Sequence, residues 1–374
     1  MIEKEVDHGC CKFITRVLII LVAGIFIAVL LMTAVYFIPT SRMEENVRRS
    51  IDIFYKEGVY PQQVAGYKSF QLDNETDAIM LLGAIYDGKE LSPLKQAMRV
   101  ARVNIKDENS GAATLVRTIW ENEEADGEST YTRYWHGYML WLKPLLFFLD
   151  YADIRVLNFA VQIVLLLVLV QKLVEQGMKK YLLPIGMALI AVNPVATAMS
   201  LQFSCIYFLI LIGMILILKY NQKWDKGHCY PYVFLILGIV TNFFDFLTYP
   251  MAALCMPLIL LLLLKSDGLR QRMWITIEYC FCFVVGYGGM WLGKWLVSSI
   301  ILNENILLNA FSQITVHSGN AVVNGEHLSR WDVVWKNLCV LARWPYILVY
   351  GIVGGGIFAE AVCAERKLRI ILKI

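Results

Sequence analysis

Long apolar runs alternate with short basic segments along most of the chain. The first run, residues 15–38, is long enough to cross a hydrocarbon core of about 30 Å as a helix. No small-residue cleavage site follows Ile38, so we interpret this run as a retained transmembrane helix and not as a signal peptide. Seven more runs of similar length bring the predicted spans to eight: residues 15–38, 155–174, 181–200, 203–220, 230–247, 248–264, 273–300 and 337–363.

A shorter apolar piece, residues 138–149, contains Lys143 and Pro144. Because it is too short for a span, we expect a re-entrant or surface-lying helix. The polar block before it has apolar residues at helical spacing in residues 77–86 and 93–104, which predicts helices resting on the membrane surface. The fold class expected is therefore an all-α polytopic membrane protein with about eight transmembrane helices and a long first loop containing surface helices.

The positions of Lys and Arg select one orientation for these spans. If the N-terminus is inside, every inner segment carries three or four bases, whereas the short outer turns at residues 193–202 and 244–250 carry none. The predicted order along the chain is a cytoplasmic N-terminus, the first span, an external loop, six further spans, a second external loop, the last span and a cytoplasmic tail. These segments are residues 1–14, 15–38, 39–153, 154–300, 301–336, 337–363 and 364–374.

Composition supports a membrane protein. Hydrophobic residues make up 58% of the 374 residues and charged residues only 17%, whereas soluble domains are about half apolar and a quarter charged. This excludes an ordinary soluble enzyme, a disordered chain and a nucleic-acid binder with a basic face. None of the nine cysteines lies in the long polar block, so a secreted disulfide framework is not expected, and no zinc-ligand spacing occurs.

Several ionisable residues lie near the predicted outer ends of spans. Arg155 begins the second span, Asp245 ends the fifth, Lys294 lies near the outer end of the seventh and Arg343 near the outer start of the eighth. Charged residues within spans are costly and usually functional, although snorkelling to the interface explains any single one. Their common depth favours a polar cavity that opens outward, and both interpretations stay open.

Three acids, Asp73, Glu75 and Asp77, directly precede an apolar helical stretch of the long loop. One interpretation is helix capping, because Asn74 or Thr76 suits an N-cap and acids are favoured at helix N-termini. The other is a carboxylate held at the membrane surface as a general base. The sequence alone does not decide between them.

The segment of residues 131–144 is dense in aromatic side chains. It suits an aromatic belt at the membrane interface. His136, beside Arg133 and Trp135, also suits contact with a phosphate or a sugar ring.

The layout resembles that of the GT-C glycosyltransferases, integral membrane enzymes that use polyprenyl-phosphate sugars. The stretch from Asp73 to Tyr86 is similar to the acidic motif and surface helix of that family's first external loop. Residues 134–142 and 155–158 are similar to its aromatic segment and to the Arg that opens the next span, and residues 193–203 to a later external turn. Trp135-His136 replaces the family's Pro-Pro pair. The Arg and Asp common in the later turn are missing, which leaves Gln202 as the only candidate there. The resemblance covers residues 15–265.

The resemblance implies a reaction at the outer face of a bacterial plasma membrane. A carboxylate deprotonates an acceptor hydroxyl, which attacks the sugar, and cations stabilise the departing polyprenyl phosphate. The partners implied are a lipid-linked sugar donor, membrane lipid and a glycan, lipid or protein acceptor, without nucleic acid. No ligand spacing demands a cofactor, and a divalent metal near the acids is compatible with the chemistry. The candidate bases are Asp73, Asp77 and Glu75, and the candidate donor ligands are Arg155, His136, Arg133, Lys294, Arg343, Gln202 and Asp245.

Two other function classes remain open. A polysaccharide or lipid transporter predicts internal repeats and broken helices near the membrane midplane, whereas the two halves of this chain show no repeat. A non-enzymatic membrane scaffold predicts that the external acids only cap helices. The stretch Gly289–Gly293 suits helix packing in all three classes.

Overall fold

The computed structural model describes residues 2–67, 70–88, 90–106, 108–245, 248–265, 267–311, 321–323 and 326–371. The chain forms two compact units, Met1–Leu307 and Leu308–Ile374. Nearly all the regular structure of both is helical. The expected helical membrane protein is confirmed at this level.

The first unit contains a bundle of long helices and a layer of short elements inserted between the first two of them. The bundle helices are α1 (Ile2–Val35), α8 (Tyr151–Glu175), α9 (Leu182–Ala191), α10 (Pro194–Met199), α11 (Leu201–Lys226), α12 (Tyr230–Phe244), α13 (Pro250–Leu264) and α14 (Leu269–Leu302), with a 3-10 turn at Lys179–Tyr181. We call residues 36–150 the α2–α7 layer. Its elements are α2 (Thr40–Arg49), α3 (Asp52–Glu57), α4 (Asn74–Ile85), α5 (Pro93–Arg99), β1 (Ala101–Asn104), α6 (Gly111–Ile119), β2 (Gly127–Thr130) and α7 (Met139–Phe148).

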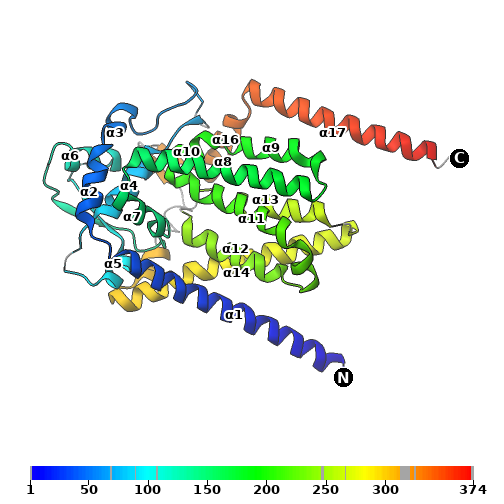
Figure 1. Ribbon diagram of the computed structural model, residues 1–374, viewed down its shortest axis with the longest axis horizontal. Helices are drawn as coiled ribbons and strands as arrows, with labels where there is room; N and C mark the ends of the chain where they lie inside the picture. Colours follow the sequence, from blue (N-terminus) through cyan, green and yellow to red (C-terminus); the bar gives the residue numbers. More distant parts are fainter. Residues whose placement is uncertain are drawn as a thin grey trace. The chain divides into compact units, whose positions relative to one another are not determined.

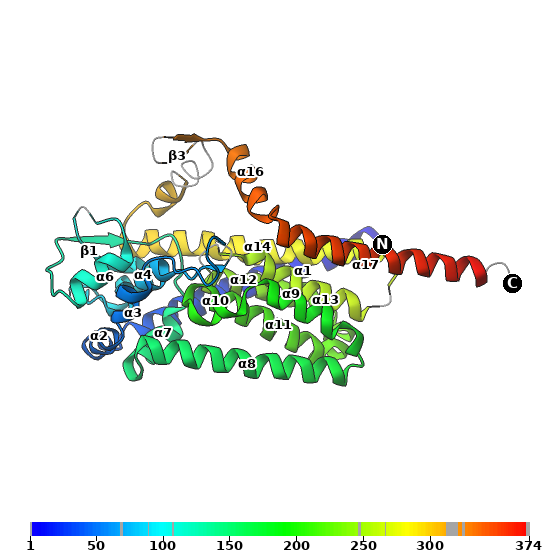
Figure 2. The same ribbon diagram turned by 90° about the horizontal axis from the view of Figure 1, so that it is seen from above.

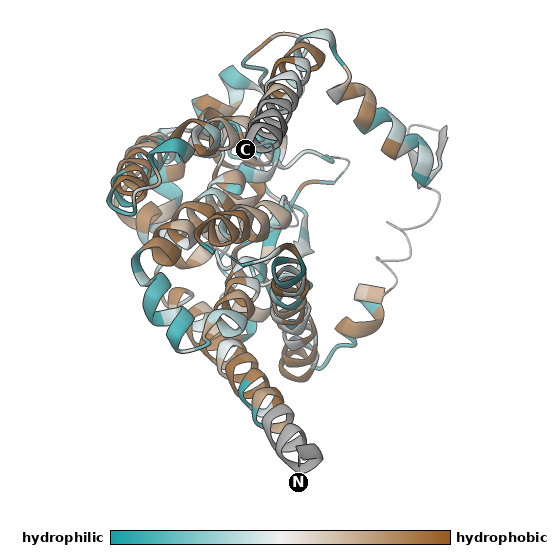
Figure 3. Cartoon of the chain, turned by 90° about the vertical axis from the view of Figure 1, so that its right-hand side faces the viewer, coloured by the Kyte–Doolittle hydropathy of each residue, from teal (hydrophilic) through white to brown (hydrophobic). Residues whose placement is uncertain are grey.

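The α2–α7 layer gathers at one end of the long helices (Figures 1 and 2). Hydrophobic residues predominate along these helices (Figure 3). Four described helices are long and apolar enough to cross a membrane: Cys11–Val35, Tyr151–Glu175, Leu201–Lys226 and Leu269–Leu302. Three shorter apolar helices, α7, α12 and α13, accompany them in this unit.

The predicted span at residues 181–200 is two helices, α9 and α10. Asn193 separates them with a left-handed backbone, at a φ of 60°, and its side chain accepts a hydrogen bond from the Ala196 backbone as the cap of α10. Pro194 follows as the first residue of α10, where a missing N–H costs nothing. An apolar run that looks continuous in sequence is therefore broken by local turn chemistry.

Glycines set the distances between bundle helices. A Cβ added to Gly238 of α12 would lie 2.1 Å from the Phe283 carbonyl oxygen, and one on Gly286 of α14 would lie 2.2 Å from that of Leu235. These two helices thus pack backbone against backbone. The predicted packing role of Gly289–Gly293 is also confirmed, because Leu21 and Ile25 of α1 fill the space above these two glycines.

Within the α2–α7 layer, α4 is almost wholly buried and forms the centre. Strands β1 and β2 form an antiparallel pair, with Ala101 opposite Thr130 and Asn104 opposite Gly127. The predicted helix at 93–104 therefore ends early, at Arg99. The reason is that Val100 takes a left-handed conformation, at a φ of 45°, and the chain turns into β1.

The second unit contains the hairpin β3 (Ala321–Val323) and β4 (Glu326–Leu328), followed by α16 (Arg330–Leu341) and α17 (Trp344–Ile371). A capping box between Ser329 and Asp332 starts α16. The stretches Arg330–Val340 and Trp344–Gly356 meet at 74°, and together they would make a fifth candidate span. The two hairpins, β1–β2 and β3–β4, correct the all-α expectation in detail.

Candidate functional site

The three acids singled out in the sequence lie at the N-termini of three different helices. Asp73 is the N-cap of its own helix α4, where its Oδ1 accepts a 2.9 Å hydrogen bond from the Thr76 backbone and its Oδ2 another of 2.9 Å from the Thr76 hydroxyl. Its backbone N–H donates to the Ser200 hydroxyl at 3.0 Å, which ties α4 to the start of α11. The side chain is half-buried, and burial raises the pKa of Asp73 above its usual value.

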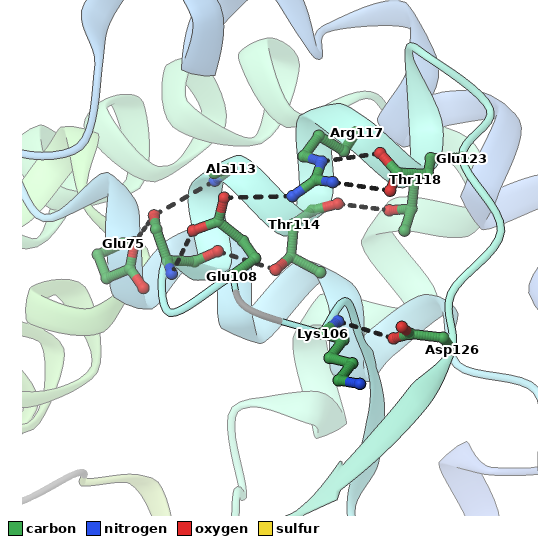
Figure 4. Close-up of polar contacts among 10 residues, drawn as sticks. Glu75, Lys106, Glu108, Ala113, Thr114, Arg117, Thr118, Glu123 and Asp126 are labelled. Carbon is green, nitrogen blue, oxygen red and sulfur yellow. Dashed lines mark hydrogen bonds and ion pairs between the residues drawn. The ribbon is translucent and has the colours of Figure 1, made fainter.

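Glu75 binds the N-terminus of α6 (Figure 4). Its carboxylate accepts hydrogen bonds from the Ser110 hydroxyl at 2.6 Å, from the Ala112 backbone at 3.2 Å and from the Gly111 backbone. Gly111 is required here, because an added Cβ would lie 2.5 Å from the Ile79 side chain. Glu75 therefore joins α4 to α6.

Asp77 is fully buried and binds the N-terminus of α11. Its Oδ2 accepts from the Tyr151 hydroxyl at 2.6 Å and from the Leu201 backbone at 2.8 Å, and its Oδ1 accepts from the Gln202 backbone at 3.1 Å. Burial raises the pKa of Asp77 to about 6, although these donors favour the ionised form. Asp77 therefore binds the start of α11 and not that of its own helix. The predicted N-caps of α4, Asn74 or Thr76, are wrong, because Asp73 caps this helix.

Arg155 forms a buried cluster with the start of the α2–α7 layer. Its Nη1 contacts both carboxylate oxygens of Glu57 at 2.9 and 3.1 Å, and its Nη2 donates to Asn74 at 2.8 Å. The guanidinium also lies over the Tyr151 ring, 4.5 Å from its centroid. We call Glu57, Asn74, Asp77, Tyr151 and Arg155 the Arg155 cluster. Because Glu57 already neutralises the Arg155 guanidinium, this guanidinium is poorly suited to bind a donor phosphate.

Lys294 lies at a helix C-terminus. Its side chain is fully buried, and its Nζ donates to the carbonyl oxygens of Met98 at 3.0 Å and Ala97 at 3.4 Å, in the last turn of α5. Lys294 therefore caps the end of α5, and its role as a phosphate ligand stays a prediction. Lys143 does the same for α4, with its Nζ 2.7 Å from the Ala84 carbonyl oxygen. In the sequence, only the position of Lys143 within an apolar run marks it as a residue with a buried partner.

Hydrogen bonds hold the aromatic segment at residues 131–138 against the bundle helices α12 and α14. The Trp135 indole donates to the Met290 carbonyl oxygen at 2.8 Å, and the Gly137 backbone donates to the Phe243 carbonyl oxygen at 2.9 Å. Gly137 has no room for a side chain, because an added Cβ would lie 2.4 Å from that same oxygen. The Trp295 indole donates in turn to the Arg133 carbonyl oxygen at 3.0 Å.

His136 is buried between its own neighbours in this segment. Its Nε2 is 2.8 Å from the Tyr131 carbonyl oxygen, and its Nδ1 is 3.2 Å from the Tyr138 hydroxyl. Burial lowers the pKa of His136 to about 3, so the ring is neutral at physiological pH. A neutral imidazole gives no net charge to a phosphate. Arg133, by contrast, is half-buried and lies over the Tyr131 ring at 5.4 Å.

Asp245 lies directly after α12, in a group of buried polar side chains. Its carboxylate accepts from the Tyr287 hydroxyl at 3.2 Å and from the Thr248 backbone at 3.0 Å. In the part of the chain that the structure describes, both amide atoms of Asn242 and the Thr241 and Thr248 hydroxyls are buried without a hydrogen-bond partner. We call Thr241, Asn242, Asp245, Thr248 and Tyr287 the Asp245 cluster. Buried polar atoms without partners are costly, which suggests a polar ligand or water here.

Apolar grooves lie between the bundle helices, and described residues line three of them. The α8 groove, of about 440 Å³, is lined by α7, α8, α11 and the end of α12; the α1 groove, of about 460 Å³, by α1, α7, α12 and Met290; and the α13 groove, of about 240 Å³, by α11, α12 and Pro257 of α13. At the layer end, Cys205 and Phe244 line the α8 groove. Gln202 lies one turn before Cys205 on α11, and its Oε1 is buried without a partner among the described residues.

The candidate residues therefore separate into distinct places. Asp77 joins the Arg155 cluster, with Asp73 and Gln202 beside it at the start of α11, whereas His136 and Arg133 lie in the segment that packs on the end of α12. Arg343 lies between α16 and α17 in the second unit. No group of three or more His, Cys, Asp or Glu side chains suited to a metal occurs among the described residues. The three acids point to different helix ends instead of a shared centre.

Comparisons with known proteins add no relative. No protein-family model matches the sequence, and neither a curated protein nor a solved structure matches it.

Proposed function

We propose that the chain is an integral membrane glycosyltransferase that moves a sugar from a polyprenyl-phosphate donor to an acceptor at the outer face of the membrane. The observation that carries this proposal is the α8 groove, which is apolar and reaches Phe244, the residue before Asp245. Its volume of about 440 Å³ is within the usual range for ligand sites. A lipid chain bound there would have its polar head at the end of the bundle that carries the carboxylates.

The proposal includes the topology expected from the sequence. The loops at residues 39–153 and 301–336 lie outside, and both termini lie in the cytoplasm, because bases gather in the segments assigned to the inside. Eight spans require α12, α13, the α9–α10 pair and the α16–α17 pair to cross the membrane, as well as the four helices that are long enough by themselves. A break such as that at Asn193 is tolerated in a membrane where protein buries it.

Asp73 is the proposed general base. Glu75 and Asp77 each accept three hydrogen bonds at the starts of other helices, whereas the Asp73 carboxylate, among the described residues, binds only Thr76 of its own helix. Its raised pKa makes it a better base than an exposed carboxylate. Asp73 takes the proton of the acceptor hydroxyl, the acceptor oxygen bonds to the anomeric carbon, and the bond from that carbon to the phosphate oxygen breaks.

Arg133 is the proposed ligand of the departing phosphate. Arg133 lies half-buried in the segment that packs on the end of α12. The neighbouring Tyr134 is close to Asp245: burial raises the pKa of Tyr134, and the charge of Asp245 adds to this effect.

The test compares Asp73→Asn with Glu75→Gln in membranes supplied with a radiolabelled polyprenyl-phosphate hexose. Asn caps a helix as well as Asp does, so we expect Asp73→Asn to keep the melting temperature of wild type. The rate of sugar transfer should fall by a factor of about 10² to 10⁴. Glu75→Gln loses a charge-assisted cap of α6, so stability falls and the remaining folded protein transfers sugar normally. Full transfer by stable Asp73→Asn would contradict the base assignment.

The scaffold alternative receives support from one observation. It predicts acids that only cap helices, and Glu75 and Asp77 do cap helices. Asp73→Asn separates the alternatives, because a scaffold loses nothing when the cap is preserved. A lipid transporter would move the labelled donor across a vesicle membrane without forming any new glycosidic product.

A further inference from the structure

The Asp245 cluster lies on the face of α12 that packs against α14. Gly238 of α12 meets the backbone of α14 on this face. Thr241, Asn242 and Asp245 follow this glycine by three, four and seven residues, so helical geometry places them on the same face. The Tyr287 hydroxyl of α14 donates to the Asp245 carboxylate from the other side. The cluster therefore points into the protein and not toward lipid.

Polar atoms of this cluster lack the partners that buried polar atoms normally have. Thr241 is 0% exposed and Asn242 2% exposed. Among the described residues, seven buried side-chain atoms make no hydrogen bond, and four of them belong to this cluster. They are the hydroxyls of Thr241 and Thr248 and both amide atoms of Asn242. Since about nine in ten buried polar groups have a partner, four such atoms at one helix end indicate a binding site for a polar group.

The chemistry of these atoms suits a cation. Three of the four are oxygens with lone pairs, and the Asp245 carboxylate adds two more oxygens. The cluster also lies at the C-terminus of α12, where backbone carbonyls carry a partial negative charge. Helix C-termini coordinate Na⁺ in this way inside membrane proteins. An anion would be repelled by the same carboxylate and carbonyls.

The number of carboxylates selects the charge of the ion. Ca²⁺ sites combine several charged ligands, and Mg²⁺ keeps several of its waters. The Asp245 cluster combines one carboxylate with neutral hydroxyl and amide oxygens, a set that balances a single positive charge. A water in the shell of such an ion would accept a hydrogen bond from the Asn242 amide nitrogen.

We propose that the Asp245 cluster binds a monovalent alkali cation, Na⁺ or K⁺. Its ligands are the Thr241 and Thr248 hydroxyl oxygens, the Asn242 amide oxygen and the Asp245 carboxylate. The ion fastens the turn after α12 to the end of that helix, where the Gly137 backbone of the aromatic segment donates to α12. This inference is independent of the proposed function, because such a site suits a transferase, a transporter or a scaffold alike.

The test measures melting of the purified full chain in dodecyl maltoside, in NaCl, KCl or choline chloride at equal ionic strength. Choline screens charges as the alkali ions do, but it is too large for the cluster. We expect NaCl or KCl to raise the melting temperature above that in choline chloride by about 2 to 5 °C. Thr241→Val and Thr248→Val each remove one ligand and keep the shape of the side chain, so both variants should lose this rise.

Thr276→Val is the matched control on α14. Its hydroxyl donates to the Arg272 carbonyl oxygen, and it lies eleven residues before Tyr287, about 16 Å along the helix. This variant should keep the full rise. Equal melting temperatures of wild type in the three salts would mean that water alone fills the cluster, which overturns the inference. A rise that persists in both ligand variants would place the ion elsewhere and overturn it as well.

Discussion

At the scale of single residues, five charged side chains of the first unit lie at the helix ends that attract their charge. Helix N-termini carry unpaired N–H groups and a partial positive charge, and C-termini carry unpaired carbonyls and a partial negative charge. Each of these five side chains supplies hydrogen bonds to backbone groups that the helix itself leaves unpaired. The pairs are Asp73 with the start of α4, Glu75 with that of α6, Asp77 with that of α11, Lys143 with the end of α4 and Lys294 with the end of α5.

The pKa of Asp77 predicts a pH-dependent stability. Burial raises this pKa to about 6 in the folded protein, from 3.8 when the group is unperturbed. Between these values the folded state binds more protons than the unfolded state, so stability falls as pH rises from about 4 to 6, by on the order of 3 kcal/mol. Thermal melting of wild type and Asp77→Asn across this range measures the effect.

Asp77→Asn is the control, because every other titrating group is the same in the variant and in wild type. We expect the difference in melting temperature between wild type and Asp77→Asn to change across this range of pH. Above pH 6 it should be constant. A difference that stays constant from pH 4 to 7 would show that Asp77 titrates at its ordinary value.

Lys294→Met tests the assignment of Lys294 as a helix cap. The variant leaves the carbonyl oxygens of Ala97 and Met98 without their donor, and we expect a loss of about 1 to 3 kcal/mol in stability. Binding of polyprenyl phosphate should be unchanged in the folded fraction. The control is Lys95→Met, at an exposed position of α5, where a change within about 0.5 kcal/mol is expected. Normal stability with lost polyprenyl-phosphate binding would restore the phosphate role.

At the scale of elements, the close approach of α12 and α14 depends on glycine. We expect Gly286→Ala to destabilise the protein by about 1 to 3 kcal/mol or more, because its Cβ meets the backbone of α12 and neither helix can yield locally. Gly288→Ala is the matched control two residues along α14, where an added Cβ meets nothing within 4 Å. It should be neutral or slightly stabilising. The melting temperatures of both variants in detergent test this expectation. Equal melting temperatures would contradict the backbone contact between α12 and α14.

Hydrophobic patterning predicts the long helices well and their interruptions poorly. The runs that became α1, α8, α11 and α14 are visible because apolar length alone specifies them. The break at Asn193 and the turn at Val100 depend on left-handed residues, which a hydropathy pattern does not reveal. In the same way, the sequence identifies Asp77 as a notable acid. It does not reveal that its partners are the backbone groups of Leu201 and Gln202, on a helix far along the chain.

At the scale of the whole molecule, the proposed orientation predicts which surfaces meet an external reagent. Glu124→Cys lies in the α2–α7 layer and Lys179→Cys in the turn after α8, both at exposed positions. In spheroplasts, a membrane-impermeant maleimide should label Glu124→Cys, and it should label Lys179→Cys only after permeabilisation. Wild type, with its nine cysteines, gives the background. The opposite pattern would invert the topology and place the candidate site in the cytoplasm.

The contact between Asp77 and the start of α11 has a consequence for biosynthesis. The carboxylate and the Leu201 N–H are 124 residues apart, and α8, α9 and α10 are synthesised between them. At about 5 to 20 residues per second, α4 waits roughly 6 to 25 s for the helix that it caps. Lys294 reaches α5 later still. During this interval the α2–α7 layer has been synthesised but lacks these contacts with the later helices. The rate of translation therefore sets the earliest time at which the contacts form.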